Sequence, residues 1–137
     1  MSTVGTVEAV SATFTAYAHA FQTLEPDAAA PYCHAPCLFI SPRGVRAMGS
    51  ASEVRALLAQ VMADLRARGY ARSEVTSRHV QPLGERIALL TVNRVRFRKD
   101  GTELERVGET YTFLETAGGW KIVAAVMHDF EATLQPM

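Results

Sequence analysis

Glu109 is the residue of this 137-residue chain whose surroundings most strongly indicate chemistry. The turn at Asp100-Gly101 fixes the register of the two strands beside it, because glycine accepts the positive φ that two-residue hairpin turns require. Side-chain alternation in that register places Glu109 opposite Val92 and on the same sheet face as Arg94. A carboxylate among apolar neighbours must be paired or protonated, and such carboxylates gather in functional pockets. Glu109 is therefore predicted either to contact a ligand or to form a salt bridge with Arg94 or His128.

Two histidines are candidates for a general acid or base, since an unperturbed imidazole titrates near pH ~6.5. If Ala117-Gly118 is the tip of the last turn, His128 lies on the face just described, whereas a three-residue loop puts Asp129 there. If the turn at Gly84-Glu85 has two residues, His79 joins that face too. For both histidines, the alternative is a residue without a chemical role.

Aromatic side chains are predicted to form either the core or the wall of an apolar pocket around these groups. Tyr111, Phe113 and Trp120 fall on the same face of the sheet. Tyr17 lies within an apolar stripe, spaced by three and four residues, that predicts an amphipathic helix over 7–24. Since a buried tyrosine hydroxyl needs a partner, Tyr17 is either a core residue bonded to a carbonyl or a donor to a ligand oxygen. The candidate catalytic residues are Tyr17, Glu109 and His128, and the candidate substrate-binding residues are Arg94, His79, Tyr111, Phe113 and Trp120.

The elements that must position these side chains follow one another along the chain. The sequence predicts a helix over 7–24, a short helix over 26–30, short strands over 37–41 and 45–48, a helix between Ser50 and Gly69, and four long antiparallel strands over 73–129. Ser50 and Glu53 have the spacing of a capping box, and Gly69 is placed to end the long helix. This order predicts an α+β fold, and the absence of a linker or repeat predicts a single domain over 1–137.

The composition argues against several classes of function. Fourteen basic and fourteen acidic residues balance, whereas general binders of nucleic acid or anionic membranes need a basic excess. The run 94–99 is basic, but its register sets Arg96 opposite Glu105 and so predicts a solvated ion pair. Arg98 faces Glu103 in the same way. No apolar run approaches the ~20 residues of a membrane span, and we expect a soluble, cytoplasmic protein without nucleic-acid or membrane partners.

Cys33 and Cys37 flank His34 in the segment Cys-His-Ala-Pro-Cys. Zinc sites generally need two cysteine pairs, or one pair with spaced histidines, and the other histidines fall in other predicted elements. The favoured interpretation is two reduced thiols, with a metal site and a structural disulfide as alternatives. No nucleotide-binding glycine motif or clustered metal-ligand spacing occurs, so no cofactor or metal is expected.

The order of the elements, together with the segment Gly119-Trp120-Lys121-Ile122, resembles the nuclear transport factor 2-like (NTF2-like) superfamily, in particular its SnoaL-like and ketosteroid-isomerase-like branches. The resemblance spans nearly the whole chain. It implies a cone-shaped (cystatin-like) fold, in which a curved antiparallel sheet wraps around a long helix and leaves an apolar pocket for a small molecule. It also implies a homodimer formed through the outer sheet face. That face is expected to carry Leu89, Thr91, Asn93, Val95, Leu104, Thr110, Thr112 and Leu114.

The steroid isomerases of this superfamily suggest roles for two of these residues. They use an aspartate base and an oxyanion hole made of a tyrosine and a neutral carboxylic acid. Tyr17 falls where their first-helix tyrosine lies, and Glu109 resembles their neutral acid. Thr110 and Tyr111 are the alternative counterparts of that acid. Ser41 stands where their catalytic aspartate would be, so steroid isomerisation by that route is not expected.

Two functions from different classes follow. The first is an enzyme that moves a proton next to a carbonyl group of an apolar substrate, in isomerase, cyclase or dehydratase-like chemistry. In it, Tyr17 and Glu109 bind the developing oxyanion, and His128 or His79 is the base. The second is a non-catalytic ligand-binding or homodimerisation module of the same fold, which the missing base at Ser41 favours.

Overall fold

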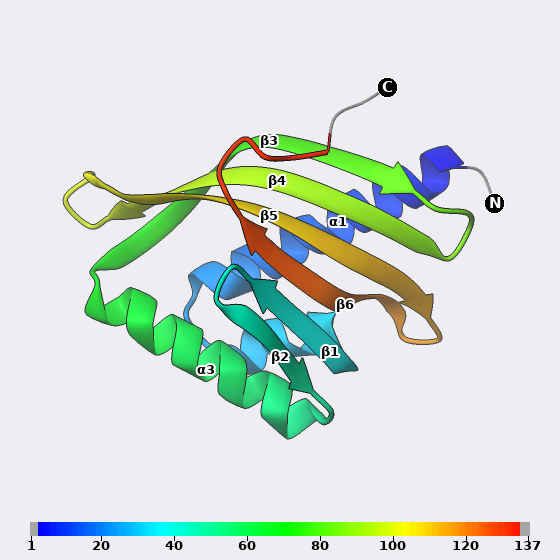
Figure 1. Ribbon diagram of the computed structural model, residues 1–137, viewed down its shortest axis with the longest axis horizontal. Coiled ribbons are helices and arrows are strands. Elements are labelled where there is room, and N and C mark those ends of the chain that lie inside the picture. The colour runs from blue at the N-terminus through cyan, green and yellow to red at the C-terminus, as the bar shows by residue number, and fades with distance from the viewer. Residues whose placement is uncertain (1–2, 135–137) are drawn as a thin grey trace.

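Six strands form one curved sheet that does not close on itself (Figure 1). The computed structural model describes residues 3–134. Its strands are β1 (Cys33–Ser41), β2 (Gly44–Met48), β3 (Tyr70–Pro82), β4 (Ile87–Arg98), β5 (Glu103–Thr116) and β6 (Gly119–His128), and its helices are α1 (Thr3–Gln22), α2 (Pro26–Ala29), the 3₁₀ helix η1 (Ala30–Tyr32) and α3 (Ala51–Ala67). The sheet order is β2-β1-β6-β5-β4-β3, and all neighbours are antiparallel except β1 and β6, which are parallel. The predicted α+β fold is confirmed.

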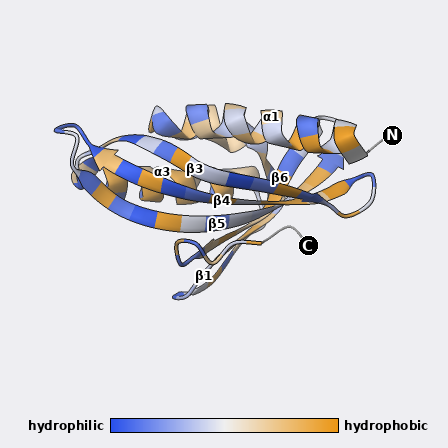
Figure 2. Ribbon diagram, turned by 90° about the horizontal axis from the view of Figure 1, so that it is seen from above, coloured by the Kyte–Doolittle hydropathy of each residue, from blue (hydrophilic) through white to orange (hydrophobic). Residues whose placement is uncertain are grey.

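Helices α1 and α3 cover one face of the sheet, which we call the inner face. Helix α1 contacts β3, β4 and β6, whereas α3 contacts β1, β2 and β3. Seen from above, α1 runs along one side of the strands (Figure 2). The core between these layers includes Val10, Phe14, Phe21, Leu57, Met62, Leu90, Phe113 and Ile122. Within residues 3–134, no helix combines the length and the hydropathy that crossing a bilayer requires.

Local sequence signals account for both ends of α3. The Ser50 Oγ accepts a hydrogen bond from the Glu53 N–H at 3.2 Å, as the capping-box spacing predicts. Gly69 follows the helix with a φ of +84°, a conformation that glycine adopts without strain. The side of α3 that faces the core carries Val54, Leu57, Leu58, Met62 and Leu65, at the three- and four-residue spacing of an amphipathic helix.

The pairing of β4 with β5 follows the register predicted from the Asp100-Gly101 turn. It is confirmed over residues 87–96 of β4, which include the partner of Glu109. Nearer the turn, a bulge pairs Phe97 instead of Arg98 with Glu103. Arg98 donates to the backbone carbonyl of Glu103 at 2.8 Å, so the ion pair predicted between these two side chains is wrong.

The pairing of β5 with β6 departs from the prediction at a β-bulge. Phe113 pairs with Ile122 as expected, but the register then shifts by one residue, so that Val123 has no partner in β5. Beyond the bulge, Met127 lies opposite Glu109. Side chains alternate between the two faces of a strand. This single extra residue therefore places each later side chain of β6 on the face opposite to the predicted one.

His128 is therefore carried away from the predicted site. It pairs with Gly108 on the outer face of the sheet, where its Nε2 lies 2.8 Å from the Thr110 Oγ1. Asp129, the alternative for this position, lies beyond the end of β6 and is exposed. The expectation that one of these two residues joins Glu109 on the inner face is wrong.

Residues 83–86 connect β3 to β4, and Leu83 and Ile87 close a turn of three residues where the prediction had two. The Leu83 N–H donates to the Ile87 carbonyl at 2.8 Å and so closes the longer loop. His79 consequently pairs with Thr91 on the outer face, and its predicted place on the inner face is wrong. Arg78 occupies the inner position instead, where it donates to two hydroxyl groups of α1 at 2.9 Å.

The chain after β6 folds back over part of the outer face (Figure 1). The Glu131 N–H donates to the Asn93 Oδ1 at 2.7 Å, and the Arg106 guanidinium lies 5.4 Å from the centre of the Phe130 ring. Asn93 and Val95, both expected on a dimer surface, are buried. The outer face open to a partner is therefore smaller than the sequence alone predicts.

Candidate functional site

Glu109 sits on the inner face between two polar partners. Its Oε1 lies 2.9 Å from the Arg94 Nε, and its Oε2 accepts a hydrogen bond of 2.7 Å from the Tyr111 hydroxyl. The Arg94 Nη2 in turn donates to the Tyr111 oxygen at 3.0 Å. The side chains of Arg94 and Glu109 are only 3% and 8% exposed, so bulk water does little to stabilise their charges. The predicted salt bridge between Glu109 and Arg94 is present.

Burial sets the protonation of the groups around Glu109. Burial raises the pKa of Tyr111 well above its usual range, and Glu109 adds to the effect. The phenol therefore stays neutral and donates a hydrogen bond to the carboxylate. Burial is the largest influence on Arg94 and lowers its pKa, but the charge of Glu109 and the neighbouring tyrosines together outweigh burial and leave the pKa of Arg94 raised. The cluster thus combines a charged pair with a neutral hydroxyl.

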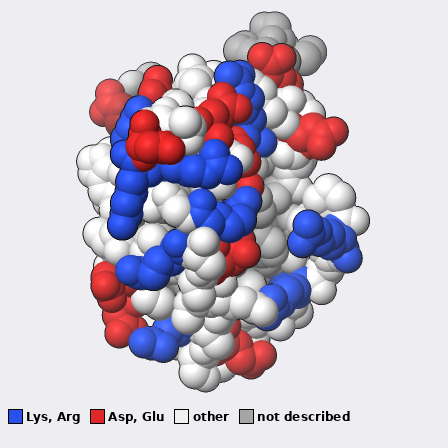
Figure 3. Space-filling model, turned by 90° about the vertical axis from the view of Figure 1, so that its left-hand side faces the viewer, with Lys and Arg blue, Asp and Glu red and all other residues white. Residues whose placement is uncertain are grey.

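A row of alternating charges leads from this pair to the surface. The Arg96 Nη1 lies 2.6 Å from the Glu105 Oε2, and the Arg68 Nη1 lies 2.9 Å from the Glu105 Oε1. Burial raises the pKa of Glu105, but its two arginine partners outweigh burial and lower it overall. Figure 3 shows the end of the molecule where this row emerges, with basic and acidic side chains interspersed. The Arg96 side chain is 5% exposed, so the prediction of a solvated Arg96–Glu105 pair is wrong.

Three buried polar atoms of this cluster lack a hydrogen-bond partner among the described residues. They are the Arg94 Nε, the Arg96 Nε and the Glu109 Oε1. The Arg94 Nε is close enough to the Glu109 Oε1 for charge attraction, but it does not form a hydrogen bond with it. Buried polar groups are nearly always hydrogen-bonded in folded proteins. An acceptor on Glu109 and a donor on Arg96 are therefore free for a ligand or for water.

A narrow cavity of about 50 Å³ lies beside these free atoms. Its walls are mostly apolar side chains from α1, α3, β1, β2 and β6, including Phe21, Leu57, Phe39, Met48 and Met127. Four polar side chains also line it: Tyr17, Arg96, Glu109 and Tyr111. The volume is enough for about one or two water molecules, so an organic ligand requires the walls to move apart.

Tyr17 reaches this cavity from α1, as the sequence predicts. Its ring centre lies 6.1 Å from that of Tyr111, nearly edge-on, and 6.3 Å from that of Tyr32. No residue of the described part of the chain forms a hydrogen bond with its hydroxyl. Burial raises the pKa of Tyr17 well above its usual value, and Tyr111 adds to the effect. Tyr17 is therefore a neutral donor without a protein acceptor.

The other predicted site residues lie elsewhere. Phe113 and Trp120 are buried on the inner face and belong to the hydrophobic core, but they do not line the cavity. His79 and His128 are on the outer face, so neither serves as a base in the cavity. Sequence reasoning missed Arg96, although alternation from Arg94 was enough to place it on the inner face.

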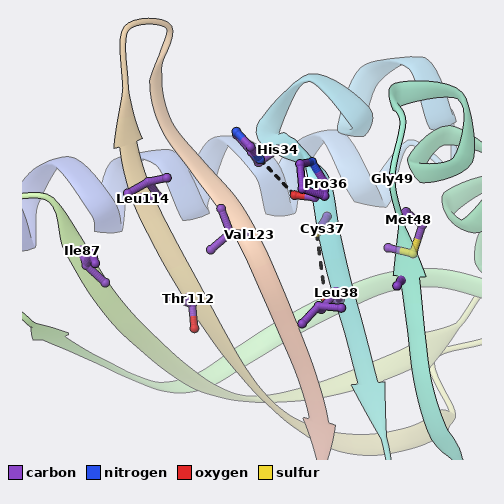
Figure 4. Close-up of a pocket in the computed structure, with 11 residues that line it drawn as sticks. His34, Pro36, Cys37, Leu38, Met48, Gly49, Ile87, Thr112, Leu114 and Val123 are labelled. Carbon is purple, nitrogen blue, oxygen red and sulfur yellow. Dashed lines mark hydrogen bonds between the residues drawn. The ribbon is translucent and has the colours of Figure 1, made fainter.

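A larger groove lies on the outer face and is lined by residues of β2, β1, β6, β5 and the start of β4 (Figure 4). It has a volume of about 470 Å³, and its walls include Leu38, Ile87, Leu114 and Val123. The polar residues in its lining are few, with His34 and Thr112 among them. Within residues 3–134, no group of three or more histidine, cysteine or carboxylate side chains is placed to hold a metal ion.

A curved six-stranded sheet, two covering helices and a cavity with a polar end define a protein of the NTF2-like, cystatin-like fold. The chain belongs to the family described as NTF2-like protein (DUF6841), which matches residues 7–130. The predicted membership of the NTF2-like superfamily is thereby confirmed. Among curated protein sequences, none matches the chain.

Solved structures with the same fold share little sequence with this chain. An NTF2-like protein with a cystatin-like fold from Novosphingobium aromaticivorans has 18% identity and a TM-score of 0.73, over 91% of this chain and 82% of that one. An NTF2-like superfamily protein from Salmonella enterica has 14% identity and a TM-score of 0.72, over 93% of both chains. A Streptomyces avermitilis protein of the NTF2-like family, proposed to be a dehydratase, has 19% identity and a TM-score of 0.73, over 96% of this chain and 100% of that one. These likenesses establish the fold and no activity.

Proposed function

We propose that the chain binds a small, largely apolar molecule in the inner cavity, with a hydroxyl or N–H group directed at Glu109 and an oxygen directed at Tyr17 and Arg96. The observation that carries this proposal is the Glu109 Oε1, a buried acceptor without a hydrogen-bond partner in the described chain, on a residue that lines the cavity. A ligand O–H or N–H would donate to this oxygen. The Tyr17 hydroxyl and the Arg96 Nε would donate to a ligand oxygen, and the apolar walls would hold the rest of the molecule.

Binding requires the cavity to widen, because ligand pockets commonly have volumes of about 300–1,000 Å³. The side chains best able to move are Met48 and Met127, which border the cavity on β2 and β6. Methionine has several rotatable bonds and adapts to irregular shapes at small energetic cost. We therefore expect these two side chains to change rotamer when a ligand enters.

A thermal-shift screen with small carbonyl and phenolic compounds tests the proposal. A ligand at a hundred times its dissociation constant stabilises the fold by about 2.7 kcal/mol, which raises the Tm of a domain of this size by several degrees. Losing a hydrogen bond to a charged acceptor costs about 1.5–3 kcal/mol, so Glu109→Gln should lose most of that shift. Tyr17→Phe should weaken it, and Glu103→Gln, at an exposed position, should keep it. Hits that bind Glu109→Gln as tightly as the parent chain would refute the role of Glu109.

Proton transfer next to a ligand carbonyl is the finer form of this proposal. Glu109 is the one carboxylate that borders the cavity in the described chain, so it would take the base role first given to the histidines. Tyr17 and Arg96 would stabilise the developing oxyanion. The similarity to the Streptomyces protein proposed to be a dehydratase agrees with such chemistry. Exchange of the ligand's α-protons in D₂O, followed by NMR, separates catalysis from binding: Glu109→Gln should abolish it, and no exchange in the parent chain leaves binding alone.

Homodimerisation through the outer groove is the second candidate function. The observation that favours it is an apolar groove of about 470 Å³ on a sheet face that neither α1 nor α3 covers. Leu38 and Ile87, both in its lining, are each 40% exposed. A second copy of the chain is the partner with a matching apolar surface, since a symmetric dimer uses the same patch on both subunits.

A further inference from the structure

Cys33 and Cys37 are brought close together by an irregularity in β1. The parallel pairing with β6 runs from Cys33 opposite Ile122 to Leu38 opposite Ala124. Strand β1 thus advances by five residues while β6 advances by two, and the intervening residues of β1 bulge out. At about 3.3 Å per strand residue, Cys33 and Leu38 lie about 7 Å apart along the sheet instead of about 16 Å.

This spacing suits a disulfide bond between the two cysteines. Cys37 directly precedes Leu38, so its Cα falls within reach of the roughly 4.4–6.8 Å that disulfides span. The two cysteines both line the inner cavity, and each thiol is near enough to shift the pKa of the other. Both are free thiols, with Cys33 half-buried and Cys37 buried. The interaction of the two thiols raises the pKa of Cys33 and lowers the pKa of Cys37, which favours the thiolate at Cys37.

Each thiol also borders a cavity that opens to the surface. Cys37 lies in the wall of the outer groove, beside Pro36 and Leu38 (Figure 4). Cys33 lies in the wall of a second surface cavity of about 410 Å³, formed by η1, β1 and the start of α3. A small molecule can therefore approach the pair from either side of β1.

We propose that Cys33 and Cys37 form a dithiol site that small-molecule disulfides oxidise to an intramolecular disulfide. The Cys37 thiolate attacks one sulfur of the small disulfide and expels its other half as a thiolate, which takes up a proton. The Cys33 thiol then loses its proton and attacks the Cys37 sulfur, which releases the second half as a thiol. Two cysteine thiols and one small disulfide become one protein disulfide and two small thiols. The site stands on its own geometry and does not depend on the proposed ligand.

Glutathione disulfide is a suitable probe of this site. The reduced 137-residue chain is incubated with it under native conditions, quenched with acid and treated with an alkylating reagent, and its mass is then measured by mass spectrometry. Both thiols should be lost together, leaving a mass lower by two hydrogen atoms and no bound glutathione. Cys33→Ala, at the half-buried position, should instead accumulate a mixed disulfide at Cys37, because the resolving thiol is gone.

Three results would overturn the proposal. The first is a parent chain that retains two alkylatable thiols, the second is a parent chain that accumulates a glutathione adduct, and the third is a parent chain linked to a second copy through one cysteine. A native gel and a thermal melt serve as the control that the Cys33→Ala variant folds. With folding established in this way, its adduct reports on chemistry at Cys37. No other ligand is present in the assay, so its result is independent of whether the inner cavity binds a carbonyl compound.

Discussion

Glu109 and Arg94 depend on each other because both charges are buried. Their 2.9 Å contact, together with the Tyr111 hydroxyl, replaces the bulk water from which burial shields both groups. Removing one partner of a buried pair leaves the other as an uncompensated charge, which costs far more than losing a surface pair. The same residue that is proposed to bind a ligand is therefore also important for stability.

Replacing Glu109 by glutamine should destabilise the fold by about 3–5 kcal/mol, because Arg94 stays buried without its counter-charge. Urea unfolding at neutral pH, followed by circular dichroism, measures the change. Glu103→Gln is the matched control, since Glu103 pairs with Arg106 at the exposed surface and should leave the midpoint nearly unchanged. Equal midpoints for the two variants would show that the buried pair contributes little.

The lowered pKa of Glu105 makes stability depend on acidity. The unfolded chain takes up a proton near the ordinary value of 4.5, whereas Arg68 and Arg96 hold the folded-state pKa below it. The Glu105 carboxylate thus makes its full contribution to the free energy of unfolding above pH 4.5 and loses this contribution as the pH falls through the folded-state pKa. Urea midpoints measured from neutral pH downward should fall less steeply for Glu105→Gln. The fall should persist in part, because other carboxyl groups also have lowered pKa values. Glu25→Gln, at an exposed position that contacts neither Arg68 nor Arg96, is the control for the substitution itself.

The sequence predicted half of the site for a definite reason. Glu109 and Arg94 were placed correctly because an Asp-Gly turn fixes the register of its own hairpin. His128 was misplaced because a bulge depends on packing against neighbouring strands and has no sequence signal of its own. His79 was misplaced because a loop with one more residue has a composition much like that of a two-residue turn.

At the scale of whole elements, the absence of a side chain at Gly108 allows β5 and the end of β6 to approach each other closely. A Cβ atom at this position would lie 2.5 Å from the Asp129 carbonyl oxygen and 2.6 Å from the His128 ring. A glycine at position 108 leaves room for the segment after His128 to turn and to run back over β4. The bulge in β6 and the glycine in β5 therefore act together to direct the last residues.

Gly108→Ala should push the segment after β6 away from the outer face and destabilise the fold by about 1–3 kcal/mol. Hydrogen exchange of the Glu131 amide, which donates to Asn93, reports the detachment, and a thermal melt reports the stability. Gly118→Ala is the matched control, because its nearest neighbours lie at 3.8 Å and its φ is not positive. Unchanged protection of the Glu131 amide in Gly108→Ala would contradict the close approach.

At the scale of the molecule, the outer face has two unlike parts. One part is covered by the chain itself where Glu131 bonds to Asn93, and the other is the open apolar groove. Only the open part is available to a second subunit, so the proposed dimer interface is centred on the groove. Exposed apolar patches of this kind commonly mark contact sites.

Sedimentation equilibrium should give the mass of a dimer for the parent chain. Ile87→Lys places a charge in the groove and should give a monomer, because burying an unpaired charge opposes association. Val45→Lys is the control, since Val45 is more exposed than Ile87 but does not line the groove. A monomeric parent chain at high concentration would exclude this interface.

The order of the whole sheet was only partly open to sequence reasoning. Four long strands joined by short turns predict neighbours, and β3 to β6 do follow one another in the sheet. The parallel pairing of β1 with β6 joins segments more than eighty residues apart, and no local signal specifies such a partner. The family resemblance supplied what local patterns did not.

The position of β6 has a consequence for how the protein is made. In the sheet, the first strand pair, β1 and β2, meets the other strands only through β6, which is the last strand in the sequence. On the ribosome, the early hairpin therefore has no neighbouring strand until the residues of β6 have emerged. Contacts between segments so far apart in the sequence slow folding. The apolar residues of β1 and β2 therefore stay exposed in the nascent chain until β6 has been made. Chains that stop before β6 should be aggregation-prone and good substrates for chaperones.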